Sequence, residues 1–230
     1  MRQTSVRVLT VIAFAGLLSS QTIAGQGVLP SSATYRGLTS SEWSALWWQA
    51  VFAIPVEGGN HPLISGGAFG GNNHLVFLAA PTVPPGSPKV TIPVTIAAGT
   101  RVFVPIISAE CSVAEPAPFH GKNRTELRAC ANNNLEQVGV LYAAIDGKPI
   151  KNPAAYRAES PLFRYGPLTA RNVLNVPPGT QSDSVAAGYF LLLPPFSAGV
   201  HRIVVRAKIP AAELVVDAEF VLQVLPPQEG

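Results

Sequence analysis

Charged residues are scarce in this chain. Asp, Glu, Lys and Arg make up 13% of its 230 residues, about half of the share usual in a soluble domain. Removing Arg2 and Arg7, which lie in the first 24 residues, from the 16 Lys and Arg leaves 14 against 13 Asp and Glu, a net charge of +1. No stripe of Lys and Arg runs along the sequence. Nucleic acid is therefore not predicted as a partner, because nothing would neutralise its phosphates.

Motifs of metal and nucleotide sites are absent as well. No two of the 4 histidines lie within five positions of each other, and there is neither HExxH nor a calcium loop, so no metal ion is predicted. The glycine pairs at 66–67 and 70–71 lack the GxGxxG pattern and a Walker lysine. They favour a flexible loop over a phosphate site, and no cofactor is predicted.

The sequence also lacks a serine nucleophile on a G-x-S-x-G turn. The nearest match, at 195–199, has no first glycine and is predicted as a turn between two strands. Two carboxylates across a cleft would suffice for a glycosidase. Four glutamates could supply them: Glu110, Glu115, Glu126 and Glu159. Their spacing along the chain does not reveal their distances in a folded sandwich, so this chemistry stays open.

Long apolar runs are missing beyond the N-terminus. After Arg2 and Arg7, residues 8–18 carry no charge, and Ala24 offers a small residue at a cleavage position. This layout is typical of a secretory signal peptide, with an uncleaved anchor helix as the alternative. No later stretch approaches the roughly 20 apolar residues of a membrane helix. We therefore predict a signal peptide over 1–24, a single domain over 25–230, and a secreted or periplasmic location without a transmembrane segment after cleavage.

Only two cysteines occur, Cys111 and Cys130. An even number in an exported chain indicates a disulfide. Closing a loop of this length stabilises a fold by roughly 3 kcal/mol in the chain-entropy model. A redox or metal pair is the alternative, but the CxxC spacing is absent.

All three tryptophans are present within six positions. Thr39 and Glu42 form a T-x-x-E capping box, which begins a helix, and Pro55 limits that helix to about Phe52. On this helix Trp43 and Trp47 lie four positions apart and share a face, while Trp48 lies about 100° around it. Because so wide an aromatic arc is unfavourable in water, we predict core packing, with a ligand platform as the alternative.

The rest of the chain is predicted to be mainly strands. Residues 213–224 alternate apolar and polar side chains, and 138–145 lead into an Asp-Gly hairpin turn. Strands at 74–79, 90–96, 102–107 and 201–207 are predicted too, with Pro93 and Pro105 requiring an edge or a bulge. Residues 189–193 are apolar on both faces and need two covers, a second sheet and the aromatic helix. The predicted fold is an antiparallel β-sandwich, jelly-roll or Ig-like, with one aromatic helix packed on it and a short second helix over 125–137.

Several segments occur in a suggestive order. They are "WSALWWQAVFAIP", "HP", "VFLAAP", "VFVPIIS", "IDGKPI", "YRAESPLF" and "AAGYFLLLPPFSAGVHRIVVRA". This order resembles a family of exported bacterial proteins of uncharacterised function. The resemblance spans nearly all of the chain after the signal peptide and implies export and one β-sandwich-like domain, but no activity. In that family an Asp usually follows the HP dipeptide, whereas Ile64 and Ser65 stand here, so a function that needs this Asp would be missing.

Two histidines differ in their expected surroundings. His201 shares a strand face with Ile203 and Val205, which predicts a hydrogen-bonded core histidine. His61 precedes Pro62 in a predicted loop over 58–73 and is the freest candidate to act.

We therefore predict a non-enzymatic β-sandwich that binds a ligand or an envelope component outside the cytoplasm. The candidate binding residues are His61, Trp48, Asn72 and Asn73. The alternatives are a secreted hydrolase acting on glycan or ester substrates, and a structural component of the envelope.

Overall fold

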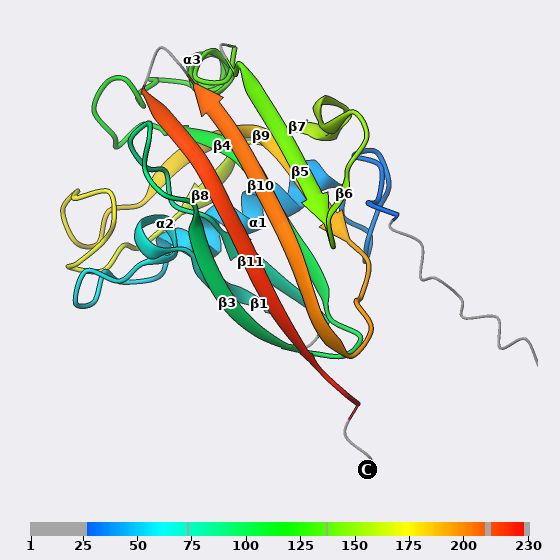
Figure 1. Ribbon diagram of the computed structural model, residues 1–230. Helices are drawn as coiled ribbons and strands as arrows, with labels where there is room; N and C mark the ends of the chain where they lie inside the picture. The colour runs from blue at the N-terminus through cyan, green and yellow to red at the C-terminus, as the bar shows by residue number, and fades with distance from the viewer. Residues whose placement is uncertain (1–26, 73, 137, 210–212, 228–230) are drawn as a thin grey trace, which may run out of the picture.

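The computed structural model describes residues 27–72, 74–136, 138–209 and 213–227. The predicted signal peptide and the candidate Asn73 lie outside this part of the chain. The described residues form a mainly β fold of two packed sheets with a few helices (Figure 1). The predicted sandwich with an aromatic helix is therefore confirmed.

The first sheet contains six strands. In order they are β1 (Gly67–Asn72), β2 (Leu75–Ala79), β4 (Arg101–Ser112), β9 (Ser182–Leu193) and β7 (Arg157–Glu159), with β8 (Phe163–Tyr165) also paired to β9. The second sheet contains, in order, β3 (Val90–Ala97), β11 (Leu214–Leu225), β10 (Gly199–Ile209), β5 (Val140–Ile145) and β6 (Lys148–Pro149). The helices are α1 (Ser40–Phe52), α2 (Pro62–Ser65), α3 (Arg124–Asn133) and the 3-10 helix η1 (Pro153–Tyr156).

The sheets are mixed rather than purely antiparallel. The pairs β2–β4 and β3–β11 run parallel, whereas the other pairs are antiparallel. This corrects the antiparallel expectation. Parallel partners are joined by long connections, and the alternation of residues within one strand carries no information about them.

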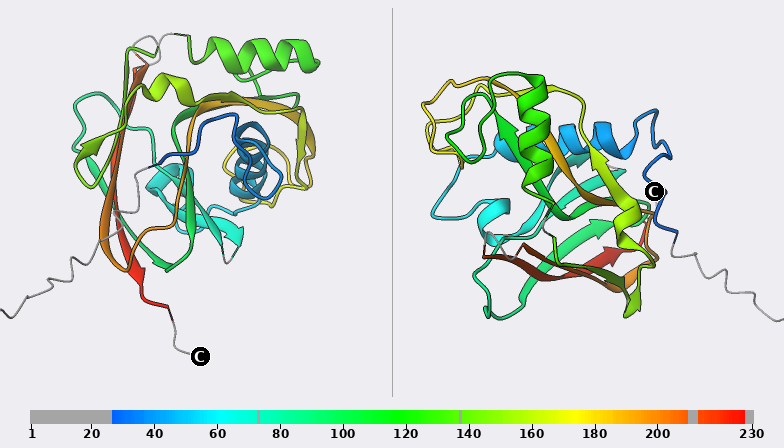
Figure 2. Two further views of the ribbon diagram at one scale, coloured as in Figure 1. Left: turned by 90° about the vertical axis from the view of Figure 1, so that its right-hand side faces the viewer. Right: turned by 90° about the horizontal axis from the view of Figure 1, so that it is seen from above.

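The first sheet lies between the second sheet and α1, so the molecule has three layers (Figure 2, left). Leu191 and Leu193 belong to the core between the two sheets. Phe190 and Leu192, on the opposite face of β9, pack in the cluster that contains α1. The two covers predicted for the apolar segment 189–193 are both present, since side chains alternate across a strand.

Helix α1 begins with the predicted capping box. The Thr39 hydroxyl accepts from the Glu42 N–H, and the Glu42 carboxylate accepts from the Thr39 N–H. Trp43, Trp47 and Trp48 are 6%, 1% and 8% exposed. The prediction that these rings are buried is confirmed, and such burial is worth a few kcal/mol for each ring.

The two prolines singled out in the sequence, Pro93 and Pro105, lie where a missing N–H is tolerated. Pro93 is in β3, at an edge of the second sheet, and Pro105 adjoins a bulge in β4. Strand β2 pairs with β4 only as far as Phe103. In this register the next donor to the Leu78 carbonyl would be the N–H of residue 105, which proline lacks. The Trp47 indole N–H donates to that carbonyl instead, at 3.0 Å, and β2 separates from β4.

The segment 58–73 differs from its predicted loop. It contains helix α2 and strand β1. Its glycines conceal the strand, because Gly70 and Gly71 have positive φ and interrupt the register with β2 between Phe69 and Asn72.

Candidate functional site

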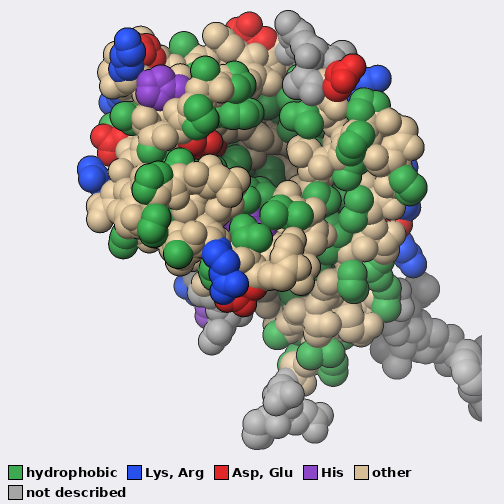
Figure 3. Space-filling view, turned by 90° about the vertical axis from the view of Figure 1, so that its left-hand side faces the viewer, with side chains coloured by type: hydrophobic (Ala, Val, Ile, Leu, Met, Phe, Trp, Pro, Cys, Tyr) green, Lys and Arg blue, Asp and Glu red, His purple; other side chains and the backbone are tan. Residues whose placement is uncertain are grey.

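A cavity of about 530 Å³ lies where β2 separates from β4. Its apolar walls come from α1, from β4 and from the second sheet. They include Trp47, Trp48, Phe52, Ile106, Leu214 and Val216. Figure 3 shows the hollowed face, with hydrophobic side chains gathered around the opening. Cavities of this size hold small ligands in other proteins.

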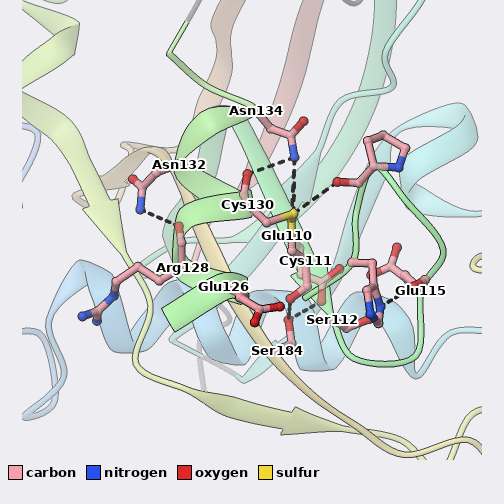
Figure 4. The surroundings of a disulfide bond; sticks show 12 residues. Glu110, Cys111, Ser112, Glu115, Glu126, Arg128, Cys130, Asn132, Asn134 and Ser184 are labelled. Carbon is pink, nitrogen blue, oxygen red and sulfur yellow. Dashed lines mark hydrogen bonds between the residues drawn. A yellow bond between two sulfur atoms is a disulfide. The ribbon is translucent and has the colours of Figure 1, made fainter. Parts of the chain in front are cut away.

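Two glutamates from one short segment line this cavity. Glu110 lies in β4 and is 4% exposed, and Glu115 follows in the next loop and is half-buried. Each carboxyl group affects the ionisation of the other. Figure 4 shows both beside Ser112, Ser184 and the disulfide. The pair forms the polar end of an otherwise apolar space.

Burial disfavours negative charge on this pair. Desolvation, followed by the neighbouring Glu115, raises the pKa of Glu110 well above its usual range. Desolvation also raises the pKa of Glu115, opposed by hydrogen bonds from Glu110 and Ser112. Two adjacent carboxyls resist ionising together, so the pair holds a proton more strongly than an exposed glutamate does, and the rise in pKa is larger for Glu110 than for Glu115.

One serine hydroxyl is shared between Glu110 and the backbone of β4. Ser184 Oγ contacts Glu110 Oε1 and also the Cys111 carbonyl oxygen, the latter at 3.0 Å. A hydroxyl has one hydrogen and a carbonyl oxygen only accepts. Ser184 therefore donates to one of these two oxygens at a time, and its donation to Glu110 opposes the rise in the pKa of that carboxyl.

A hydrogen-bonded chain holds Glu115. Ser112 Oγ donates to Glu115 Oε2 at 2.8 Å and lies 2.9 Å from the Tyr165 hydroxyl. Because Ser112 gives its hydrogen to Glu115, Tyr165 donates to Ser112. Desolvation raises the pKa of Tyr165 to about 12, so this hydroxyl keeps its proton at neutral pH. The acceptor at the end of this chain is best satisfied as a carboxylate.

None of the described residues that line the cavity is Lys, Arg or His. The ion pairs of the described chain do not include Glu110 or Glu115. In addition, the indole N–H of Trp48 is buried without a hydrogen-bond partner among the described residues. The carboxyl pair therefore has no cationic partner among the described lining residues, and the Trp48 N–H, buried within the wall, has no acceptor there; both are costly.

The predicted disulfide supports this end of β4. Cys111 and Cys130 are bonded, with their Cα atoms 6.1 Å apart. The bond joins β4, next to Glu110, to α3 (Figure 4). Asn134, which lines the cavity, donates from Nδ2 to the Cys130 carbonyl at 3.1 Å. The covalent link thus fixes two adjoining walls of the site.

The candidate binding residues have different positions. Trp48 lines the cavity, and Asn72 is the last residue of β1. His61 is 2% exposed, which corrects the expectation of a free loop histidine. Its Nδ1 accepts from the Leu63 N–H and its Nε2 donates to the Val51 carbonyl, while desolvation lowers its pKa. These bonds assign His61 to joining α1 and α2.

A second polar cluster resembles a catalytic triad. His201 Nδ1 lies 2.7 Å from Asp146 Oδ2, and its Nε2 lies 3.2 Å from Ser197 Oγ. However, Nε2 also lies 3.0 Å from the Ser197 carbonyl oxygen. When Nε2 donates to that carbonyl, it has no lone pair with which to accept the Ser197 proton. None of the three residues lines the cavity.

Only part of the site had a signal in the sequence. Glu110 and Glu115 were among four candidate carboxylates, and Glu110 interrupts the apolar run of β4. Of the other two, Glu126 accepts a hydrogen bond from Asn123, the N-cap residue of α3, and Glu159 forms an ion pair with Arg128. The contributions of Ser112, Ser184 and Tyr165 had no sequence signal, because strand pairing brings them together.

Comparison with known proteins found no matching family model, no match among curated proteins and no match among solved structures. The resemblance to exported bacterial proteins therefore stays an expectation. Among the described residues, no helix combines the length and the hydrophobicity needed to cross a membrane.

Proposed function

We propose that this chain is a non-enzymatic binding protein whose cavity beside β4 takes a ligand with an apolar body and one polar end. The observation that carries the proposal is the cavity itself, with apolar walls and a convergent carboxyl pair. A few polar groups in a mainly apolar hollow are typical of ligand sites.

We place this function outside the cytoplasm, in the periplasm or in the medium. The proposal rests on the signal-like residues 1–24 and is supported by the disulfide Cys111–Cys130, since disulfides persist in oxidising compartments. Mass spectrometry of the protein from culture fractions would test it: a chain that begins near residue 25 is expected outside the cytoplasm, and an uncut cytoplasmic chain would overturn it.

Binding can be tested with Nile red, a neutral apolar dye. Its emission should rise on binding, and Trp47 and Trp48 in the walls should transfer energy to it. Thr82→Phe places a ring at an exposed position of the cavity lining, whereas Thr95→Phe changes an exposed position of β3 outside it. We expect Thr82→Phe to weaken dye binding at least tenfold and Thr95→Phe to leave it unchanged. Equal binding by both variants would show that the cavity is not the site.

One observation favours the hydrolase alternative: a protonated Glu110 beside a more acidic Glu115 is an acid and a base in one cavity. A screen of chromogenic esters and glycosides with wild type and Glu110→Gln would decide. Turnover lost in Glu110→Gln would replace the binding proposal with an enzymatic one.

A further inference from the structure

The cavity is bordered by an unpaired strand edge. Beyond Phe103, no described strand pairs with the side of β4 that faces away from β9. On this side the backbone N–H of Ser112 donates to the Phe119 carbonyl, and the Ser112 carbonyl accepts from the Gly121 N–H. Because backbone groups alternate between the two edges of a strand, Ser108 and Glu110 direct their N–H and C=O groups to the same side. We name residues 104–110 on this side the open edge of β4.

The side chains around the open edge add a complementary requirement. The Glu110–Glu115 pair has no cationic partner among the described lining residues, so a donor that carries positive charge would complete it. The open edge itself offers both donors and acceptors at the spacing of a β-strand. A short peptide in extended conformation supplies all three: carbonyl oxygens, N–H groups and an ammonium group.

We infer that the ligand is a short extended peptide that adds to the open edge of β4 and places an ammonium group, an α-amine or a lysine, against Glu110 and Glu115. This inference rests on the proposed binding function and names its ligand class. Strand addition gives affinity through the main chain, and alternate side-chain pockets give specificity.

The two faces of the first sheet define those pockets. A bound strand would direct alternate side chains toward the aromatic wall of Trp47, Trp48 and Phe52, and toward the aliphatic wall of Ile209, Leu214 and Val216. Peptides with two successive apolar residues next to the ammonium group should therefore be selected.

The test uses a positional-scanning library of tetrapeptide amides with free N-termini and its N-acetylated copy, with affinity measured by tryptophan fluorescence and calorimetry. We expect apolar tetrapeptides with a free amine to bind, and acetylation to weaken them at least tenfold unless lysine is present. N-methylation of every second backbone nitrogen should weaken binding only when the methylated nitrogens are those whose N–H groups face β4. Glu110→Gln with Glu115→Gln should abolish the preference for a free amine, whereas the exposed Glu136→Gln should keep it.

Ser108→Pro provides a matched test on the protein side. It removes the N–H that faces the cavity and leaves the pairing with β9 intact, while Ser108→Ala keeps that N–H. We expect about fivefold to tenfold weaker peptide binding in Ser108→Pro alone. If hexylamine and Nile red bind as tightly as every peptide, or N-methylation has no effect, the peptide inference is wrong and the binding function stands. If dye and peptides all fail to bind, both are wrong.

Discussion

The Glu110–Glu115 pair and the Asp146–His201–Ser197 cluster differ in what their surroundings leave unsatisfied. In the cluster each ring nitrogen of His201 has an acceptor from the protein, and the members lie around the β9–β10 turn and the β5–β6 hairpin. The carboxyl pair lies in the wall of a cavity without a cation among its described lining residues. In this protein, the carboxyl pair that lacks a cationic partner therefore indicates function more strongly than the Ser, His and Asp residues of the triad-like cluster do.

The two clusters also differ in how they are held. Glu110 precedes a disulfide-bonded cysteine and lies in a strand paired with β9. His201 contacts Asp146 across the β10–β5 pairing, without a covalent link. Variants that remove one support at a time would sharpen this difference.

The largest effect is expected from removing the disulfide. Cys111→Ala with Cys130→Ala should lower the free energy of unfolding by roughly 3 kcal/mol, because a loop with a sequence separation of 19 is no longer closed in the unfolded chain. Urea denaturation measures the loss. Nile red binding should weaken as well, while the His201 ring resonances should stay in place in NMR spectra. A shift of those resonances would mean that the two clusters are not independent.

Next in size is the pH dependence that Glu110 introduces. Its pKa is raised in the folded state, so above the ordinary glutamate pKa of about 4.3 the unfolded state releases a proton that the folded state retains. The free energy of unfolding therefore falls as pH rises, by up to about 1.4 kcal/mol per pH unit for one proton.

Glu110→Gln should reduce this slope to the part that comes from Glu115. Urea denaturation between about pH 5 and pH 8 is expected to show the variant gaining stability relative to wild type as pH increases. Glu136→Gln serves as the exposed control and should run parallel to wild type. A constant difference between Glu110→Gln and wild type would contradict a protonated Glu110.

A smaller effect is expected at His201. His201→Ala removes the contacts to Asp146 and Ser197 from a partly exposed side chain, so the free energy of unfolding should fall by about 1 kcal/mol. Affinity for Nile red should equal that of wild type. Weaker dye binding would link this cluster to the cavity.

The smallest effect is expected at Ser197. Ser197→Ala should change the free energy of unfolding by less than about 0.5 kcal/mol, since the serine is exposed. Wild type treated with a fluorophosphonate should show no added mass on Ser197. A covalent adduct at this serine would reverse the comparison and make the triad-like cluster a reactive site.

Much of the fold was predictable because its signals are local. Thr39 and Glu42 determine where α1 begins, the Asp146-Gly147 turn places a hairpin, and side-chain alternation identified β11. The apolar stretch of β9 even predicted its two covers. Each of these features depends on residues a few positions apart.

The site was less predictable because distant segments build it. Ser184 meets Glu110 across 74 positions through the β4–β9 register. His61 was misjudged for the same reason, since its burial depends on a bond to Val51 on another helix. The parallel partners of β2 and β3 also left no trace in their own sequences.

Pro105 has a consequence for how this hollow persists. Any other amino acid at that position would bring an amide hydrogen, which could donate to the Leu78 carbonyl and extend the pairing of β2 with β4. The gap between the two strands would narrow, and the Trp47 indole N–H would lose its bond to the Leu78 carbonyl. A proline, which usually disfavours strand pairing, thus keeps β2 and β4 apart and so preserves the cavity.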